Sequence, residues 1–480
     1  MKKVWLVVAL VAFGCLAVRS FADVQNIRLS GDIRIRGYFL DSAGADISSG
    51  TPYTIEKGND SFIEQRTRVS CEADLEDHVL VVVTLQADGE WGANNGVSDA
   101  VGAGTGGANQ GTGTGKISRM WGVGIAEAYV QFNEIFYTPA TLKLGRQYLQ
   151  YGHGLILSSV EQEYNYDAAR LVLDYYPLTI DIVGAEVVNS QSFGGTPQPV
   201  FGTPTPGAND LLFVNARYEL SDSAIKDVEA YFGWLSQSQN NLNTPSRVPA
   251  TFGTGSSPLI IGARMDINPV DALQTWWEVA YEFGANGESD LVGGTDTARG
   301  SIGAFLLNVG GKYTFKDVQW VPALNANFIY ASGGGVGTDS GVGNSQFRPW
   351  FDYADGYNGY VFEPALSDIV IFNLGASVKP YENTTLSLQS YYYMKADKMG
   401  IAGSNENVDW GGPTWASPAL GSTGPDAYLG WELDGILAYD YSKDVRAQLV
   451  YGAFIPGTAY ENVGVTRTAE EVRAELLVKF

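Results

Sequence analysis

Histidine and cysteine are both scarce in this chain of 480 residues, which has two of each. So few ligating side chains argue against a disulfide framework or a metal cluster. His153 has Ser158 and Ser159 nearby in the sequence, but no third residue is placed to orient such a base–nucleophile pair. His78 lies far from both serines in the sequence. We therefore expect no enzyme, no cofactor and no metal.

Charged residues make up 17% of the chain, and acidic ones dominate, with a formal net charge of −23. That balance argues against a nucleic-acid partner. The segment GTGTGK at 111–116 lacks the spacing and the strand-to-helix context of a phosphate-binding loop. Helical periodicity and heptads are missing, as is any apolar run beyond the first residues that could cross a membrane as a helix. The mean hydropathy of −0.06 suits alternating strands, whose apolar and polar faces cancel in a window average.

The N-terminus has the pattern of a secretory signal peptide. Lys2 and Lys3 precede an apolar run at 4–17, and Ser20 and Ala22 provide small residues before a cleavage site. Cys15, after Gly14, is a weak lipoprotein signal with a poor surrounding sequence. We expect residues 1–22 to be removed and residues 23–480 to form one domain, with Cys71 as its only cysteine.

The mature chain opens with a strand that has two different faces. Residues 26–39 read NIRLSGDIRIRGYF, with apolar side chains at most odd positions. Successive side chains on a strand point to opposite faces, so this strand has an apolar face and a cationic one. The polar face carries Arg28, Ser30, Asp32, Arg34 and Arg36.

Alternating segments of this kind recur eighteen times, and their connections alternate between short and long. The short ones fall at 76–77, 134–139, 177, 221–224, 268–271, 316–320, 380–383 and 441–444; long ones include 92–115, 333–367 and 396–425. Outer-membrane barrels have short periplasmic turns, long extracellular loops and an even strand number, whereas a secreted sandwich or propeller has no reason to sort its loops this way. We predict an all-β fold: a transmembrane antiparallel β-barrel of 18 strands, with 16 as second choice. Its location is the outer membrane of a Gram-negative bacterium.

The C-terminus supports this prediction. In EVRAELLVKF, residues 471–480, apolar residues alternate with Arg473, Glu475 and Lys479, and the chain stops on Phe480. A final strand ending on phenylalanine resembles the signal by which the barrel assembly machinery recognises its clients. The expected partners are that machinery, through Phe480, together with outer-membrane lipid and lipopolysaccharide.

Strand parity assigns the arginine face to the lumen. In a closed barrel the last strand pairs with the first, so a basic strip forms from seven arginines, while Asp227, Glu229, Glu278 and Glu282 form a facing acidic wall. Rings of cationic side chains favour anions. The alternative is that these arginines only pair with Asp32, Glu64 and Glu72. The seven are Arg28, Arg34, Arg36, Arg66, Arg68, Arg446 and Arg473.

Three motifs in order resemble the outer-membrane alginate-export porin family: GIAEAYVQF at 124–132, LKLGRQYLQYGHG at 142–154 and YDAARLVL at 166–173. The resemblance implies a monomeric 18-stranded barrel whose electropositive lumen passes an anionic polyuronate outward. It also implies that Arg146 and Arg170 line the path, with Glu127 as an ion partner.

Two residues depart from what the resemblance implies. Arg146 shares parity with Leu142 and Leu144, so it faces the lumen only if the strand bulges near Gly145. His153 stands where the family motif usually has an acidic residue.

The sequence thus predicts a porin that passes anionic solutes through an arginine-lined lumen, with a polyuronate such as alginate as the candidate that the resemblance implies. A general or substrate-specific diffusion porin for small solutes, not an exporter, remains the alternative. The connection 333–367 either folds over the mouth or into the lumen as a gate, or is a plain extracellular loop.

Overall fold

The structure is a computed structural model, and it describes residues 24–41, 59–75, 78–91, 120–159, 165–189, 208–220, 224–237, 257–285, 290–292, 295–297, 301–333, 345–350, 358–364, 366–397, 426–461 and 466–480. The predicted signal peptide and the Gly-rich tract at 92–115 lie outside the described residues, as does most of 396–425.

Eighteen antiparallel strands form one sheet, as predicted. Their boundaries follow the alternating segments of the sequence closely. The strands are β1 (Val24–Asp41), β2 (Asn59–Leu75), β3 (Val79–Glu90), β4 (Met120–Phe132), β5 (Ala140–Gln147), β6 (Tyr166–Tyr175), β7 (Leu178–Asn189), β8 (Ala208–Glu219), β9 (Ile225–Gln237), β10 (Ser257–Val270), β11 (Leu273–Ala285), β14 (Ser301–Thr314), β15 (Ala323–Ala331), β16 (Ile369–Tyr381), β17 (Thr384–Lys395), β18 (Tyr428–Asp440), β19 (Val445–Pro456) and β20 (Ala469–Lys479).

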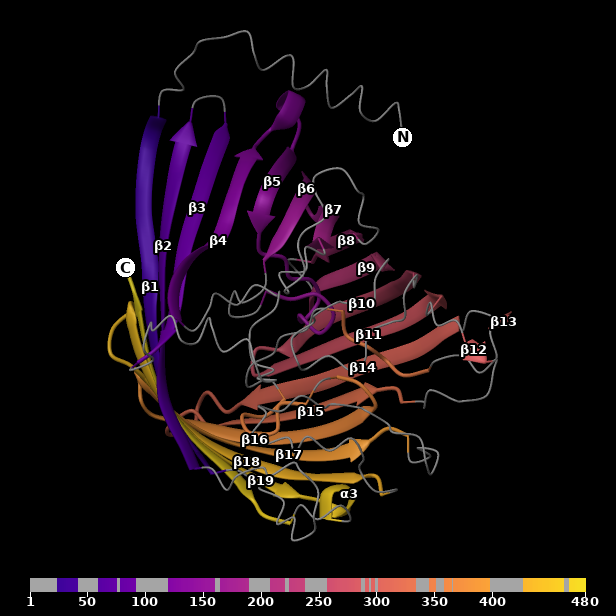
Figure 1. Cartoon of the computed structure of the whole chain (residues 1–480). Coiled ribbons are helices and arrows are strands. Elements are labelled where there is room, and N and C mark those ends of the chain that lie inside the picture. The colour runs from indigo at the N-terminus through magenta and orange to yellow at the C-terminus, as the bar shows by residue number, and fades with distance from the viewer. Residues whose placement is uncertain are drawn as a thin grey trace.

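The sheet closes because β1 pairs with both β2 and β20. The C-terminus therefore lies beside β1 (Figure 1). Gly31 and Phe480 exchange two backbone hydrogen bonds of 2.8 and 3.0 Å at this seam. An unpaired sheet edge in hydrocarbon costs several kcal/mol per exposed polar group, roughly, so closure is what allows the sheet to span a bilayer.

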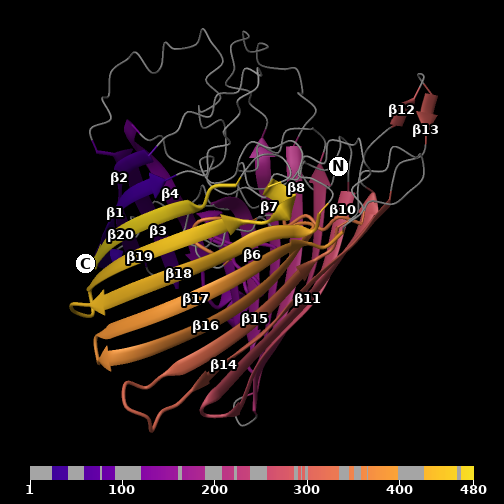
Figure 2. The same ribbon diagram turned by 90° about the horizontal axis from the view of Figure 1, so that it is seen from below.

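Few elements lie outside this sheet. β12 (Asp290–Val292) and β13 (Thr295–Thr297) form a separate hairpin, which stands apart from the barrel wall in Figure 2. The 3-10 helix η1 (Ile135–Tyr137) and the helix α3 (Thr458–Glu461) are single turns in connections. Within the described part of the chain, no helix is both long and apolar enough to cross a membrane.

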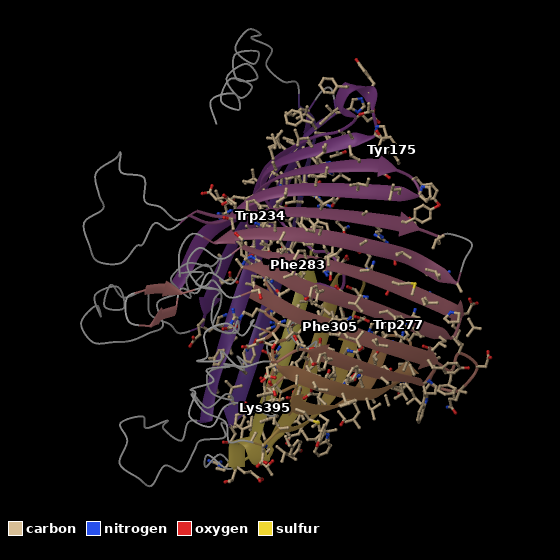
Figure 3. The ribbon with its side chains drawn as sticks, turned by 90° about the vertical axis from the view of Figure 1, so that its right-hand side faces the viewer. Tyr175, Trp234, Trp277, Phe283, Phe305 and Lys395 are labelled. Carbon is tan, nitrogen blue, oxygen red and sulfur yellow. The ribbon has the colours of Figure 1, made fainter. Side chains whose placement is uncertain are left out.

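The outer face of the barrel is apolar, and the inner face carries the buried charged residues. Trp234, Phe283 and Phe305 lie toward the strand ends that lead into the long connections, while Tyr175 and Trp277 lie nearer the short turns (Figure 3). Aromatic side chains at two levels suit the two headgroup regions of a bilayer. The free Cys71 also lies on this face, because its register partners are the exposed Leu29 and Val83.

Candidate functional site

Five of the predicted arginines share the inward face of β20, β1 and β2. We call this group, Arg34, Arg36, Arg66, Arg68 and Arg473, the basic strip. Register places Arg34 opposite Arg66 and Asp32 opposite Arg68, while Arg473 lies opposite Tyr38. The closure of the barrel brings the C-terminal Arg473 next to residues from the N-terminal strands, as the sequence pattern predicted.

Carboxylates accompany the basic strip. Asp32 accepts hydrogen bonds from Arg68 Nε at 2.6 Å and from Arg66 at 3.5 Å, and Arg473 Nε donates to Glu471 at 2.6 Å. The pairing that we considered as the alternative is therefore present.

Three other predicted arginines lie elsewhere on the inner face. Arg28 and Arg446 lie toward the short-turn end and are about half exposed, paired with Glu72 at 3.0 Å and Asp440 at 3.7 Å. Arg170, on β6, donates from Nε to Asp181 at 2.9 Å. Arg28, Arg446 and Arg170 therefore have carboxylate partners of their own and do not belong to the basic strip.

Glu127 reaches the inner face through a bulge in β4. Against β3 the register shifts by one residue, since Thr84 pairs with Glu127 while Leu85 pairs with Ile125. The Thr84 hydroxyl donates to the Glu127 carboxylate at 3.3 Å. The extra residue, Ala126, is fully buried.

The structure places Arg146 on the outer face, which differs from the prediction that it lines the path. Its register is unbroken: Leu144 pairs with Val130, and Arg146 with Ala128 and Asp167. No bulge occurs at Gly145, so Arg146 keeps the outward parity of Leu144. Its guanidinium forms a bidentate pair with Asp167, with both N···O distances at 2.9 Å.

A segment that sequence reasoning missed enters the barrel after β5. Residues 148–159, the first inward segment, bury Leu149, Leu155, Ile156 and Leu157 against inward side chains of β6–β9. The signal was available in the sequence, because YGHGLIL abandons the alternation of a strand while remaining apolar. An apolar run without period two is not a wall strand of a barrel.

Backbone groups of the first inward segment bind the acidic wall. Gly152 N donates to Glu229 Oε1 at 2.8 Å, and His153 N donates to Glu278 Oε2 at 2.8 Å. From the other side, Arg264 Nε donates to Glu229 Oε2 at 2.9 Å. These wall carboxylates thus hold the segment in place.

His153 adds charge to this contact. Its Nε2 lies 3.1 Å from Asp266 Oδ1, and its Nδ1 lies 2.8 Å from Glu278 Oε2. Burial lowers the pKa of the imidazole, but hydrogen bonds to Asp266 and Glu278 and their charges outweigh burial and raise the pKa to about 9. Arg264, which pairs with Asp266, is the nearby cation.

The charge of His153 predicts a pH dependence for the docked segment. Since its pKa lies above the ordinary value of 6.5, the stabilisation is complete below pH 6.5 and is lost as pH rises through about 9. Ring-carbon NMR of labelled histidine in a micelle measures this directly, with a His78→Gln variant to assign the two signals. A His153 midpoint at or below 6.5 would show that the two carboxylates do not hold the ring.

A second inward segment, residues 345–350 and 358–364, binds the acidic wall in the same way. Arg348 N donates to Glu282 Oε2 at 3.0 Å. Glu432 on β18 accepts from three consecutive backbone N–H groups, those of Tyr360, Val361 and Phe362, at 2.6–2.8 Å. This described part of 333–367 therefore lies inside the barrel.

Both inward segments reach the basic strip. Glu363 lies 3.4 Å from an Nη of Arg473, whose guanidinium is 5.2 Å from the ring centre of Tyr360. Tyr148, in the first inward segment, lies close enough to Arg66 and Arg68 for electrostatic interaction between its hydroxyl and their charges. The inward segments therefore contact the basic strip at Arg473 and near Arg66 and Arg68.

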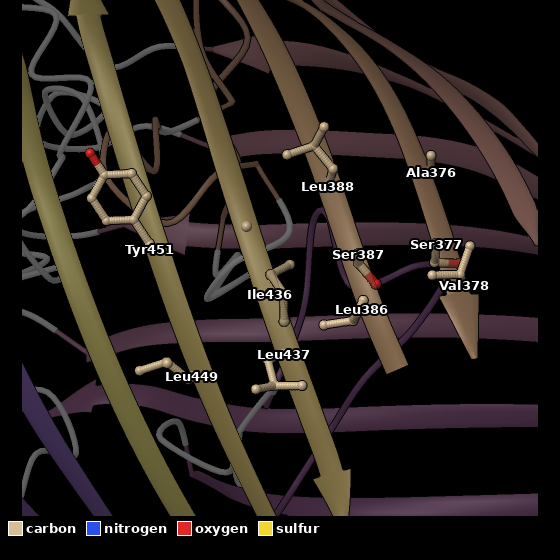
Figure 4. Close-up of a pocket in the computed structure, with 11 residues that line it drawn as sticks. Ala376, Ser377, Val378, Leu386, Ser387, Leu388, Ile436, Leu437, Leu449 and Tyr451 are labelled. Carbon is tan, nitrogen blue, oxygen red and sulfur yellow. The ribbon is translucent and has the colours of Figure 1, made fainter. Parts of the chain in front are cut away.

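Other features of the described residues offer no competing site. No group of three or more histidine, cysteine, aspartate or glutamate side chains among them is placed to hold a metal. An apolar hollow of about 440 Å³ lies on the outer wall over Gly435, bordered by Leu388, Leu437 and Tyr451 (Figure 4). Since these side chains belong to the apolar outer face, the hollow opens to lipid and not to the lumen.

Comparison with known proteins decides the family. The family model described as Alginate export matches residues 45–474. The chain belongs to the alginate export family. This family and the closed 18-stranded barrel make the protein a channel of the Gram-negative outer membrane. No curated protein matches the chain.

Solved structures share the fold of this alginate export family member at low identity. OccAB1 of Acinetobacter baumannii is 12% identical, with a TM-score of 0.54 over 96% of this chain and 98% of that one. OpdK of Pseudomonas aeruginosa, solved with vanillate, is 8% identical, with a TM-score of 0.52 over 94% and 98%. OccK2 (OpdF) of the same organism, in complex with glucuronate, is 8% identical, with a TM-score of 0.50 over 95% and 97%.

Proposed function

We propose that the protein passes anionic solutes, with uronate oligosaccharides as the preferred class, along the basic strip. The observation that carries this proposal is the gathering of five arginines from β20, β1 and β2 on one side of the lumen. Fixed guanidinium groups replace water around carboxylates in charge-assisted hydrogen bonds. Several such contacts in series allow a solute to move on, whereas one tight site would trap it.

At one point the first inward segment meets the basic strip. The Tyr148 hydroxyl and Arg68 Nη1 are both buried, and Tyr148 lies within side-chain hydrogen-bonding reach of Arg68. Tyr148 lies among the charges of Glu127, Arg68 and Arg66. A solute carboxylate that reached this point would compete with the contact between Arg68 and Tyr148.

The ligands of similar barrels agree with this chemistry. OpdK was solved with vanillate and OccK2 with glucuronate, and both ligands carry a carboxylate. Family membership adds alginate, a polymer of uronates, as a candidate solute. We also propose that residues 1–22 direct export and that Phe480 is read by the barrel assembly machinery.

A planar-bilayer recording of the purified barrel under a salt gradient tests the proposal. We expect a reversal potential on the anion-selective side, and concentration-dependent block when an oligouronate is added to one side. A neutral oligosaccharide of equal length is the control and should not block. Cation selectivity without block by the oligouronate would contradict the proposal and favour a general diffusion porin.

A further inference from the structure

Four carboxylates of the inner face share one unusual environment. Glu278, Glu282 and Glu432 are fully buried and Glu229 is 5% exposed, although all four point into the barrel. Each accepts at least one backbone N–H from an inward segment: from Gly152, His153, Arg348 or the run 360–362. The side chains that would make this part of the lumen anionic are therefore covered by the protein's own chain.

Each inward segment also brings a glycine against the carboxylate that holds it. Gly152 has φ +60°, and a Cβ there would lie 2.2 Å from Glu278 Oε1. Gly359 has φ +116°, and a Cβ there would lie 2.7 Å from Glu432 Oε1 and 2.4 Å from the hydroxyl oxygen of Tyr393, which itself lies 3.3 Å from Glu432 Oε2. Only glycine adopts such a backbone readily and leaves room for such an approach.

We propose that Gly152 and Gly359 determine the charge selectivity of the pore, because they let the two inward segments cover the carboxylates of Glu229, Glu278, Glu282 and Glu432. With the segments docked, the basic strip faces a surface whose negative charge is bound by backbone donors. With a segment undocked, negative side chains return to the lumen opposite the basic strip. Rings of acidic side chains favour cations, so selectivity then shifts away from anions. The inference rests on the proposed anion path but concerns a different set of residues.

Gly152→Ala and Gly154→Ala form a matched pair for the test. Both positions have positive φ, +60° and +80°, so both variants strain the backbone of the first inward segment alike. A Cβ at Gly154 meets Ser158 Oγ at 3.0 Å, within the segment, whereas a Cβ at Gly152 meets the wall carboxylate. We expect the reversal potential of Gly152→Ala to move toward cation selectivity relative to the unmodified barrel, and that of Gly154→Ala to stay unchanged.

Two further variants complete the experiment. Gly359→Ala should produce a similar shift through Glu432, independently of the first segment. Adding Glu229→Gln and Glu278→Gln to Gly152→Ala should restore the original reversal potential, because the exposed side chains no longer carry charge. Heat-dependent migration on a gel shows that each variant still forms the barrel.

The outcomes separate this inference from the proposed function. If Gly152→Ala conducts like the unmodified barrel, or if Gly154→Ala shifts as much, coverage of the carboxylates does not set selectivity and the inference is overturned. If the unmodified barrel is already cation-selective, the proposed anion path fails. A further cation-ward shift in Gly152→Ala alone, reversed by the two glutamines, still supports coverage in that case.

Discussion

Replacing Arg34 and Arg66 together with glutamine is expected to abolish block by an oligouronate at concentrations that block the unmodified barrel. The two side chains lie opposite each other on β1 and β2, are 8% and 6% exposed, and form the middle of the basic strip. A hydrogen bond to a charged group contributes about 1.5–3 kcal/mol, so each lost contact weakens binding roughly 10- to 150-fold. Block titrated in a planar bilayer measures the change.

Arg146→Gln is the matched control for that variant. It also removes a guanidinium paired with an aspartate, but on the outer face of β5. Its block constant and reversal potential should equal those of the unmodified barrel. If the oligouronate blocks the Arg34→Gln, Arg66→Gln variant as strongly as the unmodified barrel, solutes pass without contact with these two arginines.

Substituting valine for Gly31 is expected to prevent closure of the barrel. A Cβ at Gly31 would lie 2.3 Å from the backbone oxygen of Arg68 and 2.7 Å from the ring of Phe480. The first contact is with backbone and cannot relax through a side-chain rotation, so the β1–β2 pairing must shift. The Gly31 and Phe480 hydrogen bonds that close the seam would then be lost. We expect little or no heat-modifiable folded species on a gel, and little protein in the outer membrane.

Gly37→Val tests whether any valine in β1 has this effect. A Cβ at Gly37 meets its first neighbour, Ile63, at an ordinary 3.9 Å. Both glycines have the outward parity of β1, so the exposure of a new apolar side chain to lipid is the same. Gly37→Val should fold normally; folding of Gly31→Val to the same yield would contradict the role of the seam.

The strand pattern made most of the wall predictable. Since side chains alternate faces, segments such as 225–237, 384–395 and 445–456 were assigned to the residue from period two alone. Closure of the sheet places Arg473 opposite Tyr38, two residues along β1 from Arg36.

The interior was less predictable because it depends on contacts between distant segments. Nothing near Glu278 or Glu432 in the sequence shows that a backbone N–H from residue 153 or from 360–362 will bind it. The acidic wall was therefore predicted without the segments that cover it. Arg146 shows the converse: its parity indicated the outer face, and the family motif suggested the lumen.

The use of main-chain donors to hold the inward segments has an evolutionary consequence. Every residue except proline carries a backbone N–H, so the donors at 153 and 360–362 do not depend on the side chain at those positions, whereas Gly152 and Gly359 are exceptions because a Cβ at either would meet a carboxylate. Side chains such as Tyr148 and Tyr360, which border the basic strip, can therefore change while the segments stay in place. Substitutions at such positions can therefore change which solute the barrel accepts while the inward segments stay docked.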